Sequence, residues 1–249
     1  MKVFDLACWA NELLEISGFE ENSINGIQVA SEGTINMVAT AVSASLETIE
    51  KCVELRAQAL LVHHGILMKN NLQPLVGVQR KKIKLLIENN IALLAYHLPL
   101  DAHRQIGNNW KAAQDLGLSN MRPFCEYNKK WIGVIGFMKP IPFDEFAKRA
   151  EVYYGRSAVV VPAKKMIESV AIVSGGADRF LGDAAREGAD CYITGRFDEP
   201  VWDMAREENI SFVGLGHYAT ETIGVKALAE KIELDLGLTA TFIRTDNPF

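Results

Sequence analysis

The chain has 249 residues, of which 49% are hydrophobic and 23% are charged, and its net charge is −5 at pH 7. This composition is typical of a globular protein with one large or two modest domains. The acidic balance argues against tight nucleic-acid binding, which needs a basic surface to neutralise phosphates, although a local patch stays open as an alternative. Residues 80–84 form the one basic cluster, and we interpret it as a solvated helix face.

The cysteines and the apolar runs bear on where the protein works. The four cysteines are scattered, with no C-x-x-C spacing, which favours reduced thiols in an intracellular protein. The N-terminus reaches Asp5 before an apolar segment can form, so the sequence predicts no signal peptide. The longest apolar run, 91–96, is too short to span a bilayer. We therefore expect a cytoplasmic protein without membrane contact.

In chain order, apolar periodicity predicts strands that alternate with helices. The first half contains a helix at 4–16, strands at 38–43, 59–62 and 91–96, helices that begin at 46 and 81, and a strand-like segment at 121–125. The second half repeats this order with a helix at 143–153, strands at 170–175, 190–193 and 210–215, helices that begin at 180 and 201, a helix at 222–236 and a strand-like segment at 239–243. The first half has the longer loop, at 67–78.

This repetition predicts an α/β fold of two similar tandem domains with mostly parallel sheets. We place the first α/β repeat at 1–127 and the second at 128–249; the boundary is approximate, and C-terminal elements could pack on the first domain. Ligands of open parallel sheets bind beyond the carboxyl ends of the strands. If the halves face each other about a pseudo-twofold axis, ligands from both meet at the domain interface.

Histidines stand at several of these strand ends. His63 and His64 close the apolar run 59–62 and are followed by Gly65, and the chain has only five histidines. Neighbouring side chains on a strand point to opposite faces, but glycine lets the chain leave the β conformation. The pair then suits two neighbouring metals, one imidazole each.

Two further histidines precede a carboxylate by four residues, Asp101 after His97 and Glu221 after His217. Residues four apart share a face where the chain is helical. His97 is expected to orient a ligand or to carry a proton rather than to bind metal itself.

The predicted ligand set mixes imidazoles with carboxylates and comprises His63, His64, Asp101, His217 and Glu221. Such a set suits Zn, Mn, Fe, Ni or Co, and no thiolate restricts it to soft metals. Two divalent ions against two carboxylates leave about two positive charges for hydroxide and an anionic substrate. Glu221 is placed to bridge the ions.

Each of these features has a structural alternative. A single histidine at a strand end is commonly a hydrogen-bonded structural residue, and we assign that role to His103 near Asn108 and Asn109. The turn at 174–176, Ser-Gly-Gly, could cradle phosphate, but it lacks the Gly-x-x-x-x-Gly-Lys pattern, so we interpret it as turn chemistry.

Several motifs together resemble the dinuclear-metal GTP cyclohydrolase I type two family, also called Nif-three-like or YbgI-like. The resemblance covers essentially the whole chain. It includes Asn-Gly-Ile-Gln-Val at 25–29, His-His-Gly at 63–65, His-Leu-Pro-Leu-Asp-Ala-His at 97–103, Gly-Asn-Asn at 107–109, Ile-Thr-Gly at 193–195 and Gly-His-Tyr-Ala-Thr-Glu at 216–221.

The resemblance implies two similar α/β domains with a two-metal centre between them, held by the same five ligands. It also implies a ring-shaped homohexamer, a trimer of dimers. This chain departs from the family at Arg196, where many relatives carry an acidic residue. That departure puts any substrate contact of this loop in question.

The leading hypothesis is a metal-dependent hydrolase that acts on a nucleotide or a similar anionic small molecule. In the cyclohydrolase version the imidazole ring of GTP is opened, with His97 as candidate proton carrier. A second enzyme hypothesis is phosphoester or nucleic-acid hydrolysis at the same centre. The third hypothesis is a metal-binding protein with a regulatory or partner-docking role and no turnover.

Overall fold

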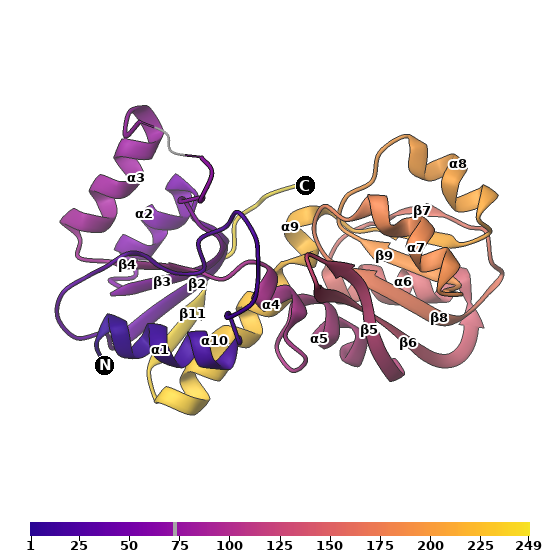
Figure 1. Ribbon diagram of the computed structural model, residues 1–249, viewed down its shortest axis with the longest axis horizontal. Coiled ribbons are helices and arrows are strands. Elements are labelled where there is room, and N and C mark those ends of the chain that lie inside the picture. The colour runs from indigo at the N-terminus through magenta and orange to yellow at the C-terminus, as the bar shows by residue number, and fades with distance from the viewer. Residues whose placement is uncertain (72–73) are drawn as a thin grey trace. The chain divides into compact units, whose positions relative to one another are not determined.

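The structure, a computed structural model, describes residues 1–71 and 74–249. The chain divides into two compact units. Unit one contains Met1–Leu100 and Gly224–Asp246, and unit two contains Asp101–Ile223 and Asn247–Phe249. The chain passes from unit one to unit two within helix α4 (Leu98–Ala102) and returns within helix α10 (Thr222–Leu236). Unit one therefore holds both early and late parts of the chain (Figure 1).

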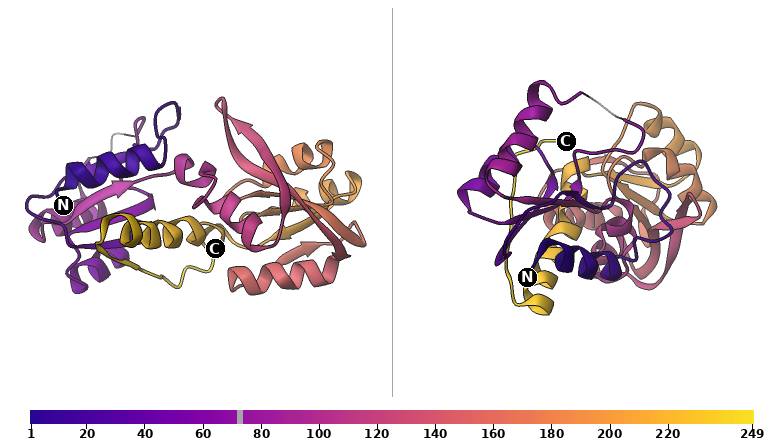
Figure 2. Two further views of the ribbon diagram at one scale, coloured as in Figure 1. Left: turned by 90° about the horizontal axis from the view of Figure 1, so that it is seen from below. Right: turned by 60° about the vertical axis from the view of Figure 1, so that its left-hand side comes forward.

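Unit one is built on a five-stranded sheet with the order β1-β4-β3-β2-β11. Strands β2, β3, β4 and β11 run parallel, and β1 is antiparallel to β4 at the edge. Helices α2 and α3 cover one face, and α1 and α10 cover the other (Figures 1 and 2). The elements are α1 (Val3–Leu13), β1 (Gly26–Val29), β2 (Met37–Ser43), α2 (Leu46–Glu54), β3 (Ala59–His64), α3 (Gly77–Glu88), β4 (Ala92–Ala95) and β11 (Thr239–Phe242).

The sequence of β3 explains its central position. Its first five residues are buried, and such a continuous run fits a parallel strand that is covered on both faces. Helix α2 begins after Ser45, whose hydroxyl accepts a hydrogen bond from the Thr48 N–H at 3.0 Å. The helix then buries Ile49 and Cys52 against the sheet. The parallel pairing of β3 with β4 places their carboxyl ends next to each other.

Unit two is built on a six-stranded sheet with the order β5-β6-β8-β9-β10-β7. The inner strands β8, β9 and β10 are parallel, while β5, β6 and β7 join in antiparallel pairs. Helices α7 and α8 lie on one face and α6 on the other (Figure 1). The elements are α5 (Asn108–Asp115), β5 (Ser119–Tyr127), β6 (Lys130–Pro142), α6 (Phe143–Tyr154), β7 (Val159–Val161), β8 (Met166–Val173), η1 (Asp178–Phe180), α7 (Leu181–Arg186), β9 (Cys191–Thr194), α8 (Pro200–Glu207), β10 (Ser211–Gly214) and α9 (His217–Thr220).

The α/β class is confirmed, with parallel strands at the centre of both sheets, but the compact units differ from the predicted division at 127/128. That point lies inside a tight hairpin, where Asn128 and Lys129 both have positive φ and Tyr127 pairs with Lys130. A two-residue turn of this kind forces β5 and β6 into one sheet, so no domain boundary can fall there. At the other end of the chain, β11 pairs with β2 and belongs to unit one, as the approximate boundary allowed.

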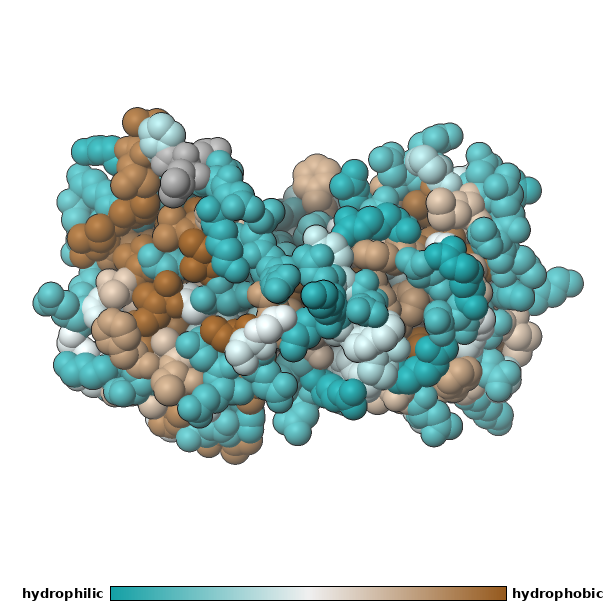
Figure 3. All heavy atoms as spheres, viewed as in Figure 1, coloured by the Kyte–Doolittle hydropathy of each residue, from teal (hydrophilic) through white to brown (hydrophobic). Residues whose placement is uncertain are grey.

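Helix α3 begins at Gly77, earlier than predicted, and shortens the expected loop at 67–78, of which residues 72–73 lie outside the described residues. The basic side chains of Arg80, Lys81 and Lys84 are exposed, as predicted for a solvated helix face, whereas Lys82 is partly buried, and burial lowers its pKa. Apolar side chains gather on the same part of the surface (Figure 3), among them Val78. Within the described ranges, no helix is long and apolar enough to cross a membrane.

Candidate metal centre

Three imidazoles meet at the carboxyl ends of β3 and β4 in unit one. His63 and His64 end β3, and His97 follows β4 by two residues. The ring centroids are 4.7 Å apart for His63 and His64, 4.9 Å for His63 and His97, and 5.5 Å for His64 and His97. One possible ligand atom from each ring lies within 4.8 Å of the others. This spacing fits ligands that share one ion or serve two ions about 3.5–4 Å apart.

The chain turns sharply after the histidine pair, and the glycine at this turn is needed for space. A Cβ at Gly65 would lie 2.3 Å from the side-chain amide of Gln28. The Gln28 Oε1 accepts hydrogen bonds from the backbone N–H groups of Ile66 (2.7 Å) and Leu67 (3.0 Å). Gln28 therefore holds the turn that directs the chain away from the site.

Hydrogen bonds fix which ring nitrogen of His63 faces the site. The His63 ring is fully buried, and its Nδ1 lies 3.0 Å from the backbone carbonyl of Tyr96. A carbonyl only accepts hydrogen bonds, so Nδ1 carries the proton and Nε2 keeps its lone pair in the neutral ring. This is the arrangement of a metal-binding histidine whose second nitrogen is bonded to a carbonyl.

His97 has a carboxylate partner that sequence reasoning missed. The Glu21 Oε2 lies 2.5 Å from the His97 Nδ1, and the Glu21 Oε1 accepts from the Asn25 Nδ2 (2.7 Å) and the Leu98 N–H (3.2 Å). Burial raises the pKa of Glu21, but the hydrogen bonds and the charge of His97 outweigh it, so this pKa lies below its usual value. Glu21 lies in a polar loop without periodicity, and only the Asn25-Gly26 motif pointed to this region.

Unit two contributes a second histidine–carboxylate pair. His217 begins α9, and its Nε2 lies 3.0 Å from Oε1 of Glu221, whose side chain is 3% exposed. Two ligands of one ion at bonds of about 2.1 Å lie roughly 3.0–3.4 Å apart, so this pair has the spacing of two ligands. A Cβ at Gly175 would lie 2.3 Å from the Glu221 Oε1 and 3.2 Å from the His217 Nε2. Only glycine leaves room for the pair at this turn.

Asp101, the remaining predicted ligand, is buried in unit two and held by neighbours. Its Oδ1 accepts hydrogen bonds from the Asn108 Nδ2 and from the Ser174 hydroxyl, each at 2.8 Å. Asn109 connects the same region, because its Oδ1 accepts from the Ser174 N–H (2.7 Å) and its Nδ2 donates to the Ile132 carbonyl (2.7 Å). The motif at 107–109 thus positions a carboxylate.

His103 and the turn at 174–176, to which the sequence analysis gave structural roles, have such roles in the structure. The Nδ1 of His103 accepts hydrogen bonds from the backbone N–H groups of Gln105 (3.2 Å) and Ile106 (3.1 Å). The turn at 174–176 is occupied by contacts of its own, since Ser174 bonds to Asp101 and Gly175 lies against Glu221.

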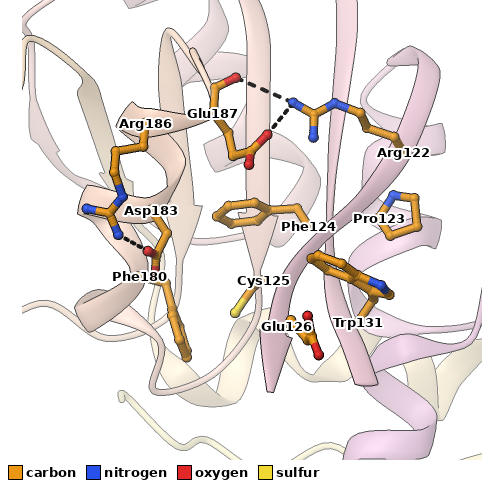
Figure 4. A pocket seen from close by; sticks show the side chains of 10 residues that line it. All are labelled: Arg122, Pro123, Phe124, Cys125, Glu126, Trp131, Phe180, Asp183, Arg186 and Glu187. Carbon is orange, nitrogen blue, oxygen red and sulfur yellow. Dashed lines mark hydrogen bonds and ion pairs between the residues drawn. The ribbon is translucent and has the colours of Figure 1, made fainter. Parts of the chain in front are cut away.

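A separate cavity of about 260 Å³ lies in unit two between β5 and α7 (Figure 4). Four of its five charged lining residues are paired, with Arg122 2.7 Å from Glu187 and Arg186 bonded to Asp183. Its described lining contains no histidine, and these carboxylates already face guanidinium groups. The cavity therefore does not offer the imidazole and carboxylate ligands that the histidine clusters offer to a metal.

The donor chemistry of both clusters fits divalent metal. Unit one offers three imidazoles. In His63, the Nδ1 is bonded to a carbonyl, so the Nε2 is the nitrogen that can bind a metal. Unit two offers an imidazole with a buried carboxylate. Imidazole with carboxylate suits Zn, Mn, Fe, Ni or Co and does not select among them.

Comparison with known proteins identifies the family of the chain. The family described as Duf34/NIF3 (NGG1p interacting factor 3) matches residues 1–248. The chain belongs to the NIF3 family. A Chlamydia pneumoniae protein named GTP cyclohydrolase 1 type 2 homolog is 44% identical over 254 residues and is covered over 100% of both chains.

Two solved structures share the fold. The structure of protein ybgI, described as of unknown function, is 34% identical with a TM-score of 0.94, and the match covers 100% of both chains. A crystal structure of a Thermus thermophilus protein is 31% identical with a TM-score of 0.91, again over 100% of both chains. The family resemblance inferred from the sequence motifs is confirmed.

Proposed function

We propose that this NIF3-family protein is a metal-dependent hydrolase that acts on an anionic small molecule, specifically a nucleotide. The observation that carries the proposal is the gathering of three imidazoles at one sheet edge of unit one. In the proposal these groups and the carboxylate groups of unit two serve one pair of divalent ions. The proposed ligands are His63, His64, Asp101, His217 and Glu221.

Three of the proposed ligands are held by neighbours that fix their orientation. The Tyr96 carbonyl orients His63, and the Ser43 hydroxyl lies 3.1 Å from the His64 Nδ1. Ser174 orients Asp101 by a hydrogen bond to its carboxylate. Partners of this kind hold ligands in place before the ion binds. Bound divalent ions would lower the pKa of water and polarise the bond under attack.

His97 is the proposed proton carrier. The Glu21 carboxylate holds its Nδ1, and its ring lies 4.9 Å from the His63 ring between their centroids, so in the proposal Nε2 is the nitrogen that accepts or returns a proton at the substrate. A carboxylate that binds the far nitrogen stabilises the ring in its protonated form during such a transfer. Glu21 therefore acts as a positioning residue for His97 in this proposal.

The nucleotide substrate is supported by the names of relatives, several of which are called GTP cyclohydrolase 1 type 2 homolog. The two-metal arrangement supports an anionic substrate, because two divalent ions exceed the charge of two carboxylates. The proposal places the protein in the cytoplasm, where it would assemble as a homohexamer, a trimer of dimers.

Metal counting tests the site. The protein is purified, supplied with each candidate metal in turn, and the metals per chain are measured by mass spectrometry for the wild type, His64→Ala and His217→Ala. We expect about two ions per wild-type chain and loss in both variants. His103→Ala is the matched control, because its ring bonds to its own loop. Fewer than one ion per wild-type chain would exclude the proposed centre.

Turnover is tested separately with the same proteins. The wild type is assayed against a panel of nucleotides and phosphoesters, with product separation by chromatography, beside His97→Ala and His64→Ala. We expect nucleotide turnover that both variants lose. Metal without turnover across the panel would contradict the hydrolase and favour a regulatory or docking role. Turnover of phosphoesters alone would favour the second enzyme hypothesis, phosphoester hydrolysis at the same centre.

A further inference from the structure

Arg156, between α6 and β7, holds an unusual position in unit two. Its guanidinium lies flat against Gly216, since a Cβ there would be 2.9 Å from the Arg156 Cζ and Nε and 3.0 Å from Nη1. Gly216 has φ +87°, a conformation that favours glycine, and it directly precedes His217. Arg156 therefore reaches the strand end from which the candidate ligand projects.

Arg156 as a whole residue is partly buried, and its side chain forms no ion pair or hydrogen bond with any residue in the described ranges. A partly desolvated cation without an acidic partner costs free energy unless something else compensates it. The chain has more acidic than basic residues, with a net charge of −5, yet none of its described carboxylates pairs with Arg156. The position is therefore suited to an anion from outside the chain.

A second arginine approaches His217 from another strand. A Cβ at Gly176 would be 3.6 Å from the His217 Cε1 and 3.9 Å from the Arg196 Cδ, so both side chains border the same glycine. Arg196 is 60% exposed, and its nearest carboxylates, on Asp178 and Asp198, are 3.9 and 3.8 Å away. These distances exceed a direct hydrogen bond, so the guanidinium can turn to a better acceptor.

The two arginines lie along one edge of the sheet. Gly175, Gly195 and Gly216 follow the adjacent parallel strands β8, β9 and β10, and they are joined by backbone hydrogen bonds. The Gly195 N–H donates to the Gly175 carbonyl (3.1 Å), and the Gly216 N–H donates to the Gly195 carbonyl (2.9 Å). Arg196 follows the middle glycine, and Arg156 covers the last. His217 projects from the same row.

We propose that Arg156 and Arg196 form an anion-binding site beside His217 that takes a phosphate group of the substrate. Guanidinium groups bind phosphate through paired, charge-assisted hydrogen bonds, which a planar fork makes better than an ammonium does. The inference rests on the proposed function for its substrate, but the site consists of this chain's own side chains. It assigns Arg196 a role as a substrate contact.

Binding of inorganic pyrophosphate tests the site without turnover. Isothermal titration is performed on the full chain, both as purified and after removal of metal with EDTA. We expect wild-type binding that weakens with added salt. Arg156→Gln should weaken it about tenfold or more, and Arg156→Lys should give an intermediate loss, because charge remains without the fork.

Further variants separate a binding role from a folding role. Arg196→Gln and Arg196→Glu should also weaken binding, the charge reversal more strongly, and this exposed side chain can change without loss of the fold. Arg206→Gln, on the exposed face of α8, is the matched control and should bind like the wild type. Thermal unfolding midpoints of all variants should stay close to the wild type.

The outcomes separate this proposal from the metal centre. Arginine-dependent pyrophosphate binding by a protein that holds no metal would leave the anion site in place and contradict the hydrolase. Two metals per chain with no pyrophosphate binding would overturn the anion site alone. Equal pyrophosphate affinity in the wild type, Arg156→Gln and Arg196→Gln would also overturn it.

Discussion

The Glu21 carboxylate lies 2.5 Å from Nδ1 of His97 and joins two segments that are 76 residues apart in the chain. The same carboxylate accepts hydrogen bonds from Asn25 and from the backbone of Leu98. A buried carboxylate with this many donors is stabilised in its charged form. The polar loop before β1 is thereby fixed to the end of β4, where the imidazoles gather.

Glu21→Gln should destabilise the metal-free protein by about 2 kcal/mol at pH 7, because hydrogen bonds to a charged group are replaced by neutral ones. The pKa of Glu21 is lowered from its usual 4.5 on folding. Its contribution is therefore complete above about pH 4.5 and is lost as the pH falls through the folded-state value. Urea unfolding at several pH values should show a gap between wild type and variant that narrows in acid.

The control for this prediction is Glu88→Gln, because Glu88 faces Lys84 at 3.5 Å on the exposed surface of α3. Such exposed pairs contribute little, so this variant should unfold like the wild type at every pH. A Glu21→Gln gap that stays constant between pH 7 and pH 3.5 would contradict the assignment.

Gly175→Ala should disturb the His217–Glu221 pair, because its Cβ would lie 2.3 Å from the Glu221 Oε1. Gly155→Ala is a matched control: Gly155 has φ +66°, close to the +68° of Gly175, and nothing lies within 4 Å of its added Cβ. Both variants should lose about 1 kcal/mol of stability to backbone strain. Only Gly175→Ala should lose bound metal, measured per chain by mass spectrometry. Equal metal content in the two variants would refute the steric argument.

The order of the parallel strands and of the helices between them was predictable, because buried parallel strands leave continuous apolar runs such as 59–62. The antiparallel strands β1, β6 and β7 were not predicted. The metal candidates were predictable for a related reason: His63 and His217 stand at strand ends, where parallel sheets place their sites. Local sequence could indicate both features. It left open that C-terminal elements pack on the first domain, but it could not indicate that β11 would pair with β2, because edge pairing depends on partners far away in the chain.

Glu21 shows the same limit at the site. Its partner His97 is distant in sequence, and a glutamate in a polar loop has no periodicity that would distinguish it from its neighbour Glu20. The anion site was hidden for a different reason. Arg156 is significant only because Gly216 leaves room for its guanidinium, which is a contact between elements rather than a motif.

The thiols should differ sharply in reactivity. Cys8 is exposed, whereas Cys52, Cys125 and Cys191 are buried. Burial raises the pKa of Cys52 and of Cys125 to about 12, and it also raises the pKa of Cys191. The reactive thiolate is therefore scarce at the buried positions at pH 8.

Ellman's reagent should thus modify one thiol per native chain at pH 8 and four in denaturant. The negative charge of Glu12 raises the pKa of Cys8, so its reaction should speed up between pH 8 and pH 9.5. Cys8→Ser should remove the fast phase. Rapid reaction of a second thiol in this variant would show that a buried position opens readily.

Ser174→Ala should weaken metal binding through Asp101. The Ser174 hydroxyl donates to the Asp101 Oδ1 at 2.8 Å inside unit two, beside the Asn108 amide, so its loss removes one of the donors that hold that oxygen in place. Loss of a hydrogen bond to a buried carboxylate should cost about 1–3 kcal/mol of stability. Loss of a group that orients a ligand should raise the dissociation constant for metal roughly 10- to 100-fold.

Ser119→Ala is the control, because its hydroxyl donates to the Phe137 carbonyl at an exposed position of the same unit. It should bind metal like the wild type in competition with a chelator. If Ser174→Ala loses stability but keeps wild-type metal affinity, then Ser174 supports the fold and Asp101 is not a ligand that it orients. A loss of both, with Ser119→Ala unchanged, is expected because one carboxylate oxygen cannot hold its direction toward an ion when a main donor is removed.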